Sequence, residues 1–168
     1  MFKKILLLLA ALILVSGLAF GQSYAQDGML IQPGSVNVNA GIGYSYHSYG
    51  IDVGGGAEVA IGKFMLGETL PFTYGLAARI GFAIARDYVD PLSLGAFGTL
   101  HFCWGALDLP PELAWIGNFD SYLGLGLNFL PALYFNSIGG FSYFFNEYLA
   151  LNLEAGLRSS YIGLLFKL

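Results

Sequence analysis

Apolar residues recur at every second position in eight separate segments of this chain, and this alternation narrows the folds that it can adopt. A period of two indicates a β-strand with one apolar face. The last segment is the plainest, because Ile162, Leu164, Phe166 and Leu168 alternate with a mixed row up to the C-terminus. An edge strand of a soluble sheet would show the same pattern, so the other segments must decide. The expected strands are 35–47, 51–61, 71–85, 92–104, 122–129, 136–145, 149–158 and 160–168.

The first 25 residues differ from the rest. Lys3 and Lys4 precede an unbroken apolar run over residues 5–15, and Ser23-Tyr24-Ala25 offers a small-residue cleavage site. This order is typical of a secretory signal peptide, and the run is shorter than the roughly 20 residues that a spanning helix needs. We expect residues 1–25 to be a signal peptide and residues 26–168 to form a single domain.

Composition limits what that domain can be. The chain is 56% hydrophobic and 11% charged, against roughly 25% charged in soluble domains, so charges are too few to cover a water-soluble surface. After Ala25 no apolar run is long enough for a membrane helix. A closed barrel is the remaining common solution, because it pairs every backbone group within the sheet. The predicted fold is all-β, an eight-stranded antiparallel transmembrane up-and-down β-barrel.

The second face of the segments shows which way the apolar face points. That face consists mostly of Gly, Ala, Asn and Ser with a few charges, which suits the lining of a narrow barrel. Apolar side chains then face outward, as in outer-membrane barrels. In the segment 136–145, where aromatic residues fall on both faces, we assign Phe141, Tyr143 and Phe145 to the outside. The expected aromatic girdles are Tyr44, Tyr46 and Tyr88 at one end, and Phe72, Trp104, Tyr148 and Phe166 at the other.

The last strand carries Tyr161, Gly163, Phe166 and Leu168 in an order that resembles the C-terminal assembly signal of bacterial outer-membrane barrels. It differs in ending on Leu168, where most such proteins end on Phe. With the hairpin over 144–151 and the strand count, the chain resembles the small eight-stranded outer-membrane barrels, the group of the OmpA membrane domain, OmpX and OmpW. The resemblance implies a monomer in the outer membrane of a diderm bacterium. Its implied partners are membrane lipid, periplasmic chaperones and the barrel-assembly machinery.

The long connections depart from that group, whose periplasmic turns are short. With both termini periplasmic, the connections 62–70 and 105–116 fall on the periplasmic side. Two explanations stay open at this point. Either these segments fold back as strand extensions or a short helix, or the expected strand boundaries are wrong.

Charged residues on the inward face are the most specific feature of the expected barrel. A lone charge there costs several kcal/mol, so the charges should pair. We predict a pair between Arg79 and Glu154, with Glu58 nearer Lys167 or His101. Such a network is either a plug that fixes the barrel or the gate of a selective channel, and the narrow interior favours the plug. The predicted inward charges are Asp52, Glu58, Arg79, Glu154, Arg158 and Lys167.

Two other clusters could carry chemistry. His47, Ser48 and Asp52 surround one turn, and some eight-stranded barrels modify lipid A, but three residues around a short turn rarely form a triad. His101 and Cys103 share a face, yet two ligands are too few for a closed metal site. We therefore expect no metal, cofactor or enzyme activity.

Three functions remain open from the sequence. The first is a structural or small-solute role for an outer-membrane barrel with a plugged lumen. The alternatives are a surface adhesin that binds through its loops and, less favoured, a lipid A-modifying enzyme. Short predicted loops offer little of the roughly 800 Å² per partner that a stable interface buries. The excess of acidic over basic residues argues against nucleic acid as a partner.

Overall fold

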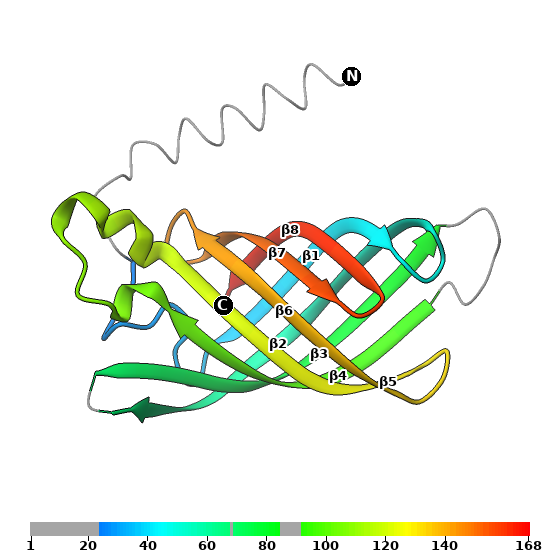
Figure 1. The fold of residues 1–168 in the computed structure, drawn as a ribbon, viewed down its shortest axis with the longest axis horizontal. Coiled ribbons are helices and arrows are strands. Elements are labelled where there is room, and N and C mark those ends of the chain that lie inside the picture. The colour runs from blue at the N-terminus through cyan, green and yellow to red at the C-terminus, as the bar shows by residue number, and fades with distance from the viewer. Residues whose placement is uncertain (1–23, 68, 85–91) are drawn as a thin grey trace, which may run out of the picture.

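A computed structural model describes residues 24–67, 69–84 and 92–168, which form a closed barrel of antiparallel strands (Figure 1). Each strand pairs with the next along the chain, and β8 closes the barrel against β1. The eight-stranded all-β prediction is confirmed. Residues 1–23 of the expected signal peptide lie outside the described residues. The strands are β1 (Val36–Ser45), β2 (Gly50–Leu66), β3 (Leu70–Ile84), β4 (Leu92–Cys103), β5 (Phe119–Leu130), β6 (Tyr134–Phe144), β7 (Leu149–Gly156) and β8 (Ser159–Lys167).

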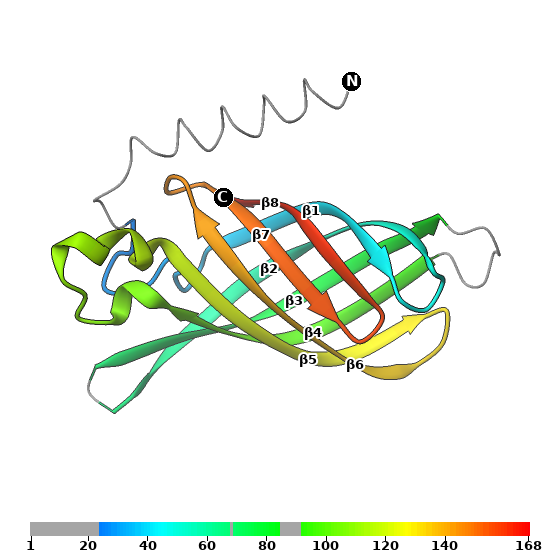
Figure 2. The same cartoon turned by 45° about the horizontal axis from the view of Figure 1, so that its top comes forward.

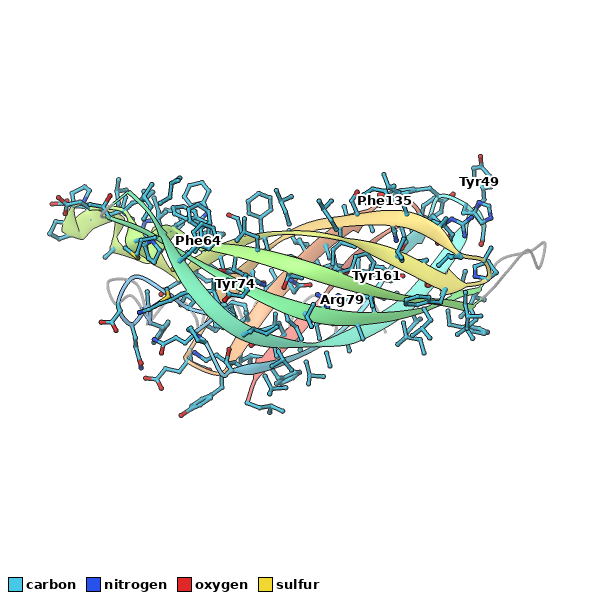
Figure 3. The ribbon with its side chains drawn as sticks, turned by 90° about the horizontal axis from the view of Figure 1, so that it is seen from below. Tyr49, Phe64, Tyr74, Arg79, Phe135 and Tyr161 are labelled. Carbon is cyan, nitrogen blue, oxygen red and sulfur yellow. The ribbon has the colours of Figure 1, made fainter. Side chains whose placement is uncertain are left out.

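The two faces of the sheet have the predicted orientation. On β3, the side chain of Leu76 is 60% exposed, whereas that of the next residue, Ala77, is 5% exposed. The aromatic residues of β6 divide in the same way, since Phe141 is exposed and Phe144 is fully buried. Phe135, also on β6, stands on the outside of the barrel in Figure 3. Large apolar side chains therefore cover the outside, and small or polar ones fill the interior. In the described part of the chain, no helix has the length and hydrophobicity to cross a membrane.

The two long connections take different forms, and both lie at the end of the barrel where residues 24–35 are found (Figures 1 and 2). The segment 62–70 is a strand extension, because β2 continues to Leu66 and β3 begins at Leu70. The segment 105–116 is mostly helical, with the short 3-10 helices η2 (Trp104–Ala106) and η3 (Pro111–Asn118).

The expected end of the second strand at residue 61 is wrong, because a bulge interrupts the alternation there. The pairing with β3 shifts between Ala60 and Gly62. The extra residue exchanges the two faces, so that Gly62 and Phe64 pair with the outward-facing Tyr74 and Phe72. A single period of two therefore does not run through β2, and the sequence pattern ends five residues before the strand does.

An N-terminal plug, residues 26–35, enters the same end of the barrel. Leu30 and Ile31 are each 1% exposed and pack with buried apolar side chains that include Phe144. The Thr73 hydroxyl donates to the Ile31 carbonyl at 2.7 Å, and Lys167 Nζ donates to the Leu30 carbonyl at 3.1 Å. The plug is thus held by apolar burial and by its own backbone oxygens.

Candidate functional site

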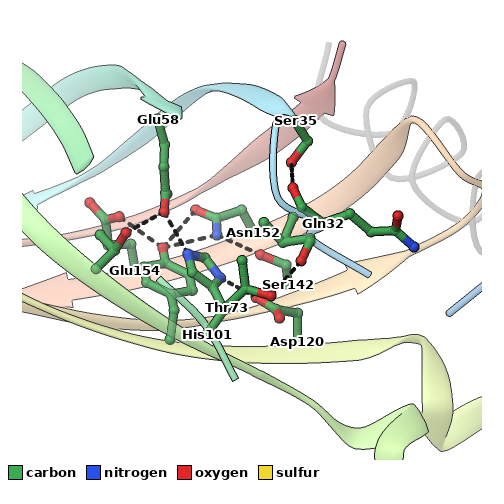
Figure 4. Close-up of polar contacts among 12 residues, drawn as sticks. Gln32, Ser35, Glu58, Thr73, His101, Asp120, Ser142, Asn152 and Glu154 are labelled. Atoms are coloured by element: carbon green, nitrogen blue, oxygen red, sulfur yellow. Dashed lines mark hydrogen bonds and ion pairs between the residues drawn. The ribbon is translucent and has the colours of Figure 1, made fainter. Parts of the chain in front are cut away.

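Polar side chains from five strands meet in the middle of the barrel (Figure 4). Because side chains alternate along each strand, every second residue of β2, β3, β4, β5 and β7 faces the interior, and one or two from each of these strands reach this point. We call this group the central network. Its members are Glu58, Arg79, Thr99, His101, Asp120, Tyr122, Asn152 and Glu154.

Arg79 lies between two glutamates. Its Nε is 3.0 Å from Oε2 of Glu154 and 3.3 Å from Oε1, and its Nη2 is 3.7 Å from Oε2 of Glu58. Gly56 provides space for this side chain, since a Cβ there would lie 2.6 Å from Cδ of Arg79. The structure thus brings together Arg79 and Glu154, the pair predicted from the sequence. It also places a second acceptor beside the guanidinium.

His101 bridges two carboxylates from other strands. Its Nε2 is 2.6 Å from Oε1 of Glu58, and its Nδ1 is 2.7 Å from Oδ2 of Asp120. The Thr99 hydroxyl donates to the same oxygen of Glu58. Each of the two ring-nitrogen contacts needs a proton between the nitrogen and the carboxylate oxygen, and an imidazole protonated on both nitrogens supplies both protons. His101 then provides a second cation among the three acids of the network. Of the two positions predicted for Glu58, the structure shows the one beside His101.

Tyr122 connects the network to uncharged side chains. Its hydroxyl donates to Oε2 of Glu154 at 2.8 Å and accepts from Nδ2 of Asn152 at 3.0 Å. Nδ2 of Asn152 also donates to Oγ of Ser142 at 3.0 Å. Gly140 leaves room for the phenol, because a Cβ there would lie 2.5 Å from its Cζ. Hydrogen bonds and ion pairs therefore run without a break from Asp120 to Ser142.

Two of the predicted inward charges lie apart from the central network. The guanidinium of Arg158 lies over the ring of Tyr134, with 4.2 Å between Cζ and the ring centroid. Lys167 binds the plug at the Leu30 carbonyl. Neither side chain forms an ion pair within the described residues, so the expected balance of three acids and three bases does not form one cluster.

Asp52 also lies apart, and it contacts a residue of the predicted assembly signal. The hydroxyl of Tyr161 donates to Oδ2 of Asp52 at 2.7 Å. Figure 3 shows Tyr161 within the barrel, where it borders the glycines Gly54 and Gly81. Of the other members of that signal, Phe166 and Leu168 are exposed on the outside, and Gly163 allows close approach to Ala40 of β1.

Asp120 is the charged network residue that the sequence does not predict. The alternation in the fifth segment is plain only from Tyr122 onward. Continuing the same parity back by two residues assigns Asp120 to the interior, and β5 indeed begins at Phe119. The buried Asp120 then meets His101 across the β4–β5 pair.

In the two other clusters considered from the sequence, around the turn at His47 and at His101 and Cys103, the members contact different partners. Asp52 is buried beside Tyr161, whereas His47 is exposed in the turn after β1. Both nitrogens of His101 face carboxylates, and Sγ of Cys103 lies 3.5 Å from the Gly117 carbonyl. Among the described residues, no three or more His, Cys, Asp or Glu side chains are placed to hold a metal ion.

A polar cavity of about 70 Å³ occupies the half of the lumen farther from the plug. It reaches from Arg79 and Glu154 in the middle of the barrel to His47 and Arg158 near the opposite end. Asp52 and Tyr161 form part of its wall. The central network lies between this cavity and the N-terminal plug.

A designed membrane barrel is among the solved structures that resemble this chain. No protein-family model matches the sequence, and no curated protein matches it. The solution NMR structure of the de novo designed TMB2.3 is 17% identical, with 83% of this chain and 98% of that chain covered. The TM-score is 0.44.

Proposed function

We propose that this protein is an integral outer-membrane β-barrel of the small eight-stranded kind, with a structural role and a closed lumen. The position of its charges carries the proposal. Among the described strand residues, the charged side chains lie on the inward face of the sheet, including Lys63, which pairs with the buried Thr73 in the hairpin extension of β2 and β3 and is exposed there. In the described strands, the outside of the barrel therefore carries no charged side chain and is covered mostly by apolar ones, as a lipid-facing surface must be.

Aromatic side chains at the plug end support the same placement. Phe72 lies between Phe64, on which it stacks with ring centroids 5.4 Å apart, and Phe102, against which it is tilted with ring centroids 5.2 Å apart. We call a second row, Trp104, Phe119, Tyr143 and Phe145, the aromatic ladder; its neighbouring rings are 6.5, 4.8 and 5.6 Å apart. Aromatic residues concentrate where a membrane meets water.

The predicted girdles match this arrangement in part. Phe72 and Trp104 lie in these rows, and Tyr44 and Tyr46 form a pair 6.0 Å apart toward the other end. Tyr88, also expected at that end, lies outside the described residues.

The lumen is obstructed at two levels, and this favours a structural role over solute permeation. The central network fills the middle of the barrel, and the N-terminal plug fills one end. The remaining cavity of about 70 Å³ has room for a few water molecules, each of which needs about 10–15 Å³. Among the described residues, the cavity does not continue past Arg79 and Glu154 toward the plug. An interior of eight strands is just wide enough for side chains to fill.

The remaining parts of the proposal follow from the barrel and the resemblance. Closure of β8 on β1 leaves no free sheet edge, which favours a monomer. Insertion into the outer membrane of a diderm bacterium would require the signal peptide, periplasmic chaperones and the barrel-assembly machinery. No contact in the described structure favours the adhesin or the lipid A-modifying enzyme.

Two leucine substitutions test whether the outside faces lipid. Leu76 and Leu66 are 60% and 59% exposed, but Leu66 lies in the hairpin extension. In vesicles, Leu76→Arg should lower the free energy of unfolding by roughly 2–4 kcal/mol, and Leu66→Arg by about 0–1 kcal/mol, because the cost of a charge falls away from the bilayer midplane. Equal small effects would contradict the proposal.

A further inference from the structure

An apolar groove of about 280 Å³ crosses the outer surface of β3 to β6. For comparison, an apolar cavity of about 150 Å³ in another protein binds benzene. The groove is therefore large enough for a hydrocarbon chain segment. Its lining residues are Phe72, Leu100, Phe102, Ser121, Tyr122, Leu123, Gly139, Gly140 and Phe141.

Two small residues on the outward face create this groove. Ser121 on β5 pairs with Phe102 on one side and Phe141 on the other, so a short side chain stands between two large rings. Gly139 on β6 pairs with Leu123 and has no side chain of its own. Cross-strand neighbours are only about 4.5–5.5 Å apart, so the missing side chains leave a continuous depression.

The groove presents hydrocarbon rather than hydrogen-bonding groups. Ser121 is the polar side chain on its outer face, and Trp104 Nε1 donates to its hydroxyl oxygen. The side chain of Tyr122 points inward, and its hydroxyl forms hydrogen bonds with Glu154 and Asn152. Since burial of apolar surface is the main gain available here, the fitting occupant is an apolar chain.

The position of the groove relative to the aromatic ladder indicates which apolar chain. Phe102, Ser121 and Phe141 form one cross-strand row, and Phe119 and Tyr143 of the ladder pair two residues further toward the plug end. Two residues correspond to about 7 Å along a strand. If the ladder marks the membrane interface, the groove opens just inside the hydrocarbon layer, in the leaflet on the plug side.

We propose that this groove binds one acyl chain of a glycerophospholipid from the leaflet on the plug side, as a retained lipid. This inference rests on the proposed membrane location. The groove is continuous with the apolar outside of the barrel, so the lipid that covers that surface also reaches the groove. A second copy of the chain or a peptide would have to displace that lipid.

Two glycines provide a test and its matched control. A Cβ on Gly139 would lie 3.1 Å from Cδ2 of Leu123, an exposed side chain that can move, so Gly139→Leu should fill the groove. Gly98 on β4 also faces outward and has no neighbour nearer than 3.9 Å, but it lies outside the groove. Gly98→Leu should therefore leave the groove open. Ser121→Leu fills the groove from β5, should Gly139→Leu fail to fold.

The experiment measures retained lipid by native mass spectrometry. Each protein is refolded into vesicles of palmitoyl-oleoyl phosphatidylethanolamine and then extracted into detergent. We expect one retained phospholipid on the unmodified protein and on Gly98→Leu. The groove-filling variants should retain it about tenfold less, the loss expected from about two buried methylenes.

Two outcomes would overturn the proposal while leaving the barrel in the membrane. One is an inserted unmodified barrel that retains no lipid, and the other is retention that the groove-filling variants do not change. Insertion is followed in the same samples by gel mobility before and after heating. A protein that does not insert would overturn both this inference and the proposed function.

Discussion

The central network and the N-terminal plug fill the same lumen with opposite chemistry. The network consists of charged, hydroxyl and amide groups whose bonds depend on one another, and it involves five strands. The plug consists of apolar side chains and backbone carbonyls, and it adds to a barrel that is already closed by strand pairing. Loss of one network charge should therefore affect the whole barrel, whereas loss of one plug contact should affect the plug alone.

The largest effect is expected for Arg79. Arg79→Ala or Glu154→Ala leaves a buried charge without its partner and should lower the free energy of unfolding by about 3–5 kcal/mol. The double variant should lose less than the sum, because no orphaned charge remains. Urea unfolding in vesicles measures this cycle. The cycle with Glu58→Ala should show weaker coupling, since Glu58 lies 3.7 Å from Arg79 and has His101 as a second partner.

Additive losses at Arg79 and Glu154 would remove the difference between network and plug. Each residue would then stabilise the barrel independently, like any buried side chain.

His101→Phe should have the next largest effect. It leaves Glu58 and Asp120 without the group between them and should cost about 2–3 kcal/mol at neutral pH, the cost of unsatisfied buried groups. In acid, the two carboxyls can take up protons and lose their charge, so the cost of the substitution should shrink. Urea unfolding at the two pH values checks this, and a cost independent of pH would argue against charged carboxylates beside His101.

In the plug, Leu30→Ala should cost about 2 kcal/mol of docking free energy, near the lower end for buried leucines, because the segment can shift. Hydrogen exchange of residues 26–34 should quicken, whereas exchange in the strands should stay unchanged. Leu133→Ala, at a leucine that is 70% exposed, is the control and should change neither. Faster exchange in the strands of Leu30→Ala would mean that plug and barrel are one cooperative unit.

The smallest effect is expected for Thr73→Val, which removes the hydrogen bond to the Ile31 carbonyl. The expected cost to docking of the plug is about 1 kcal/mol. Thr73→Ser keeps the hydroxyl and should behave more like the unmodified protein. Hydrogen exchange of the plug again provides the measurement. Equal effects of the two substitutions would show that the Thr73 hydroxyl does not stabilise the docked plug.

The network and the plug also differ in how far the sequence predicts them. A period of two assigns Glu58, Arg79 and Glu154 to the interior, because parity is a local property of a strand. The partners of these residues depend on register between strands, which explains why Lys167 remains an alternative for Glu58. The sequence does not assign Asp120 to the interior, because the alternation is not plain at the start of its strand.

The plug has no comparable signal in the sequence. Met29, Leu30 and Ile31 are consecutive apolar residues without a period, and the barrel holds the latter two through backbone oxygens that every residue possesses. The turn before them depends on Asp27 and Gly28, both at positive φ. A segment that is bound in this way can be recognised only from the structure of the barrel that binds it.

Planar-bilayer conductance of a chain that lacks residues 26–34 tests the closed lumen most directly. Without the plug, the central network remains between the cavity and the end of the barrel that the plug occupied. The network should still close the barrel, so we expect no steady current from this chain or from the full-length protein, with insertion verified by heat-dependent gel mobility. A steady ion current through the plug-free barrel would contradict closure by the paired charges of Arg79, Glu154, Glu58 and His101.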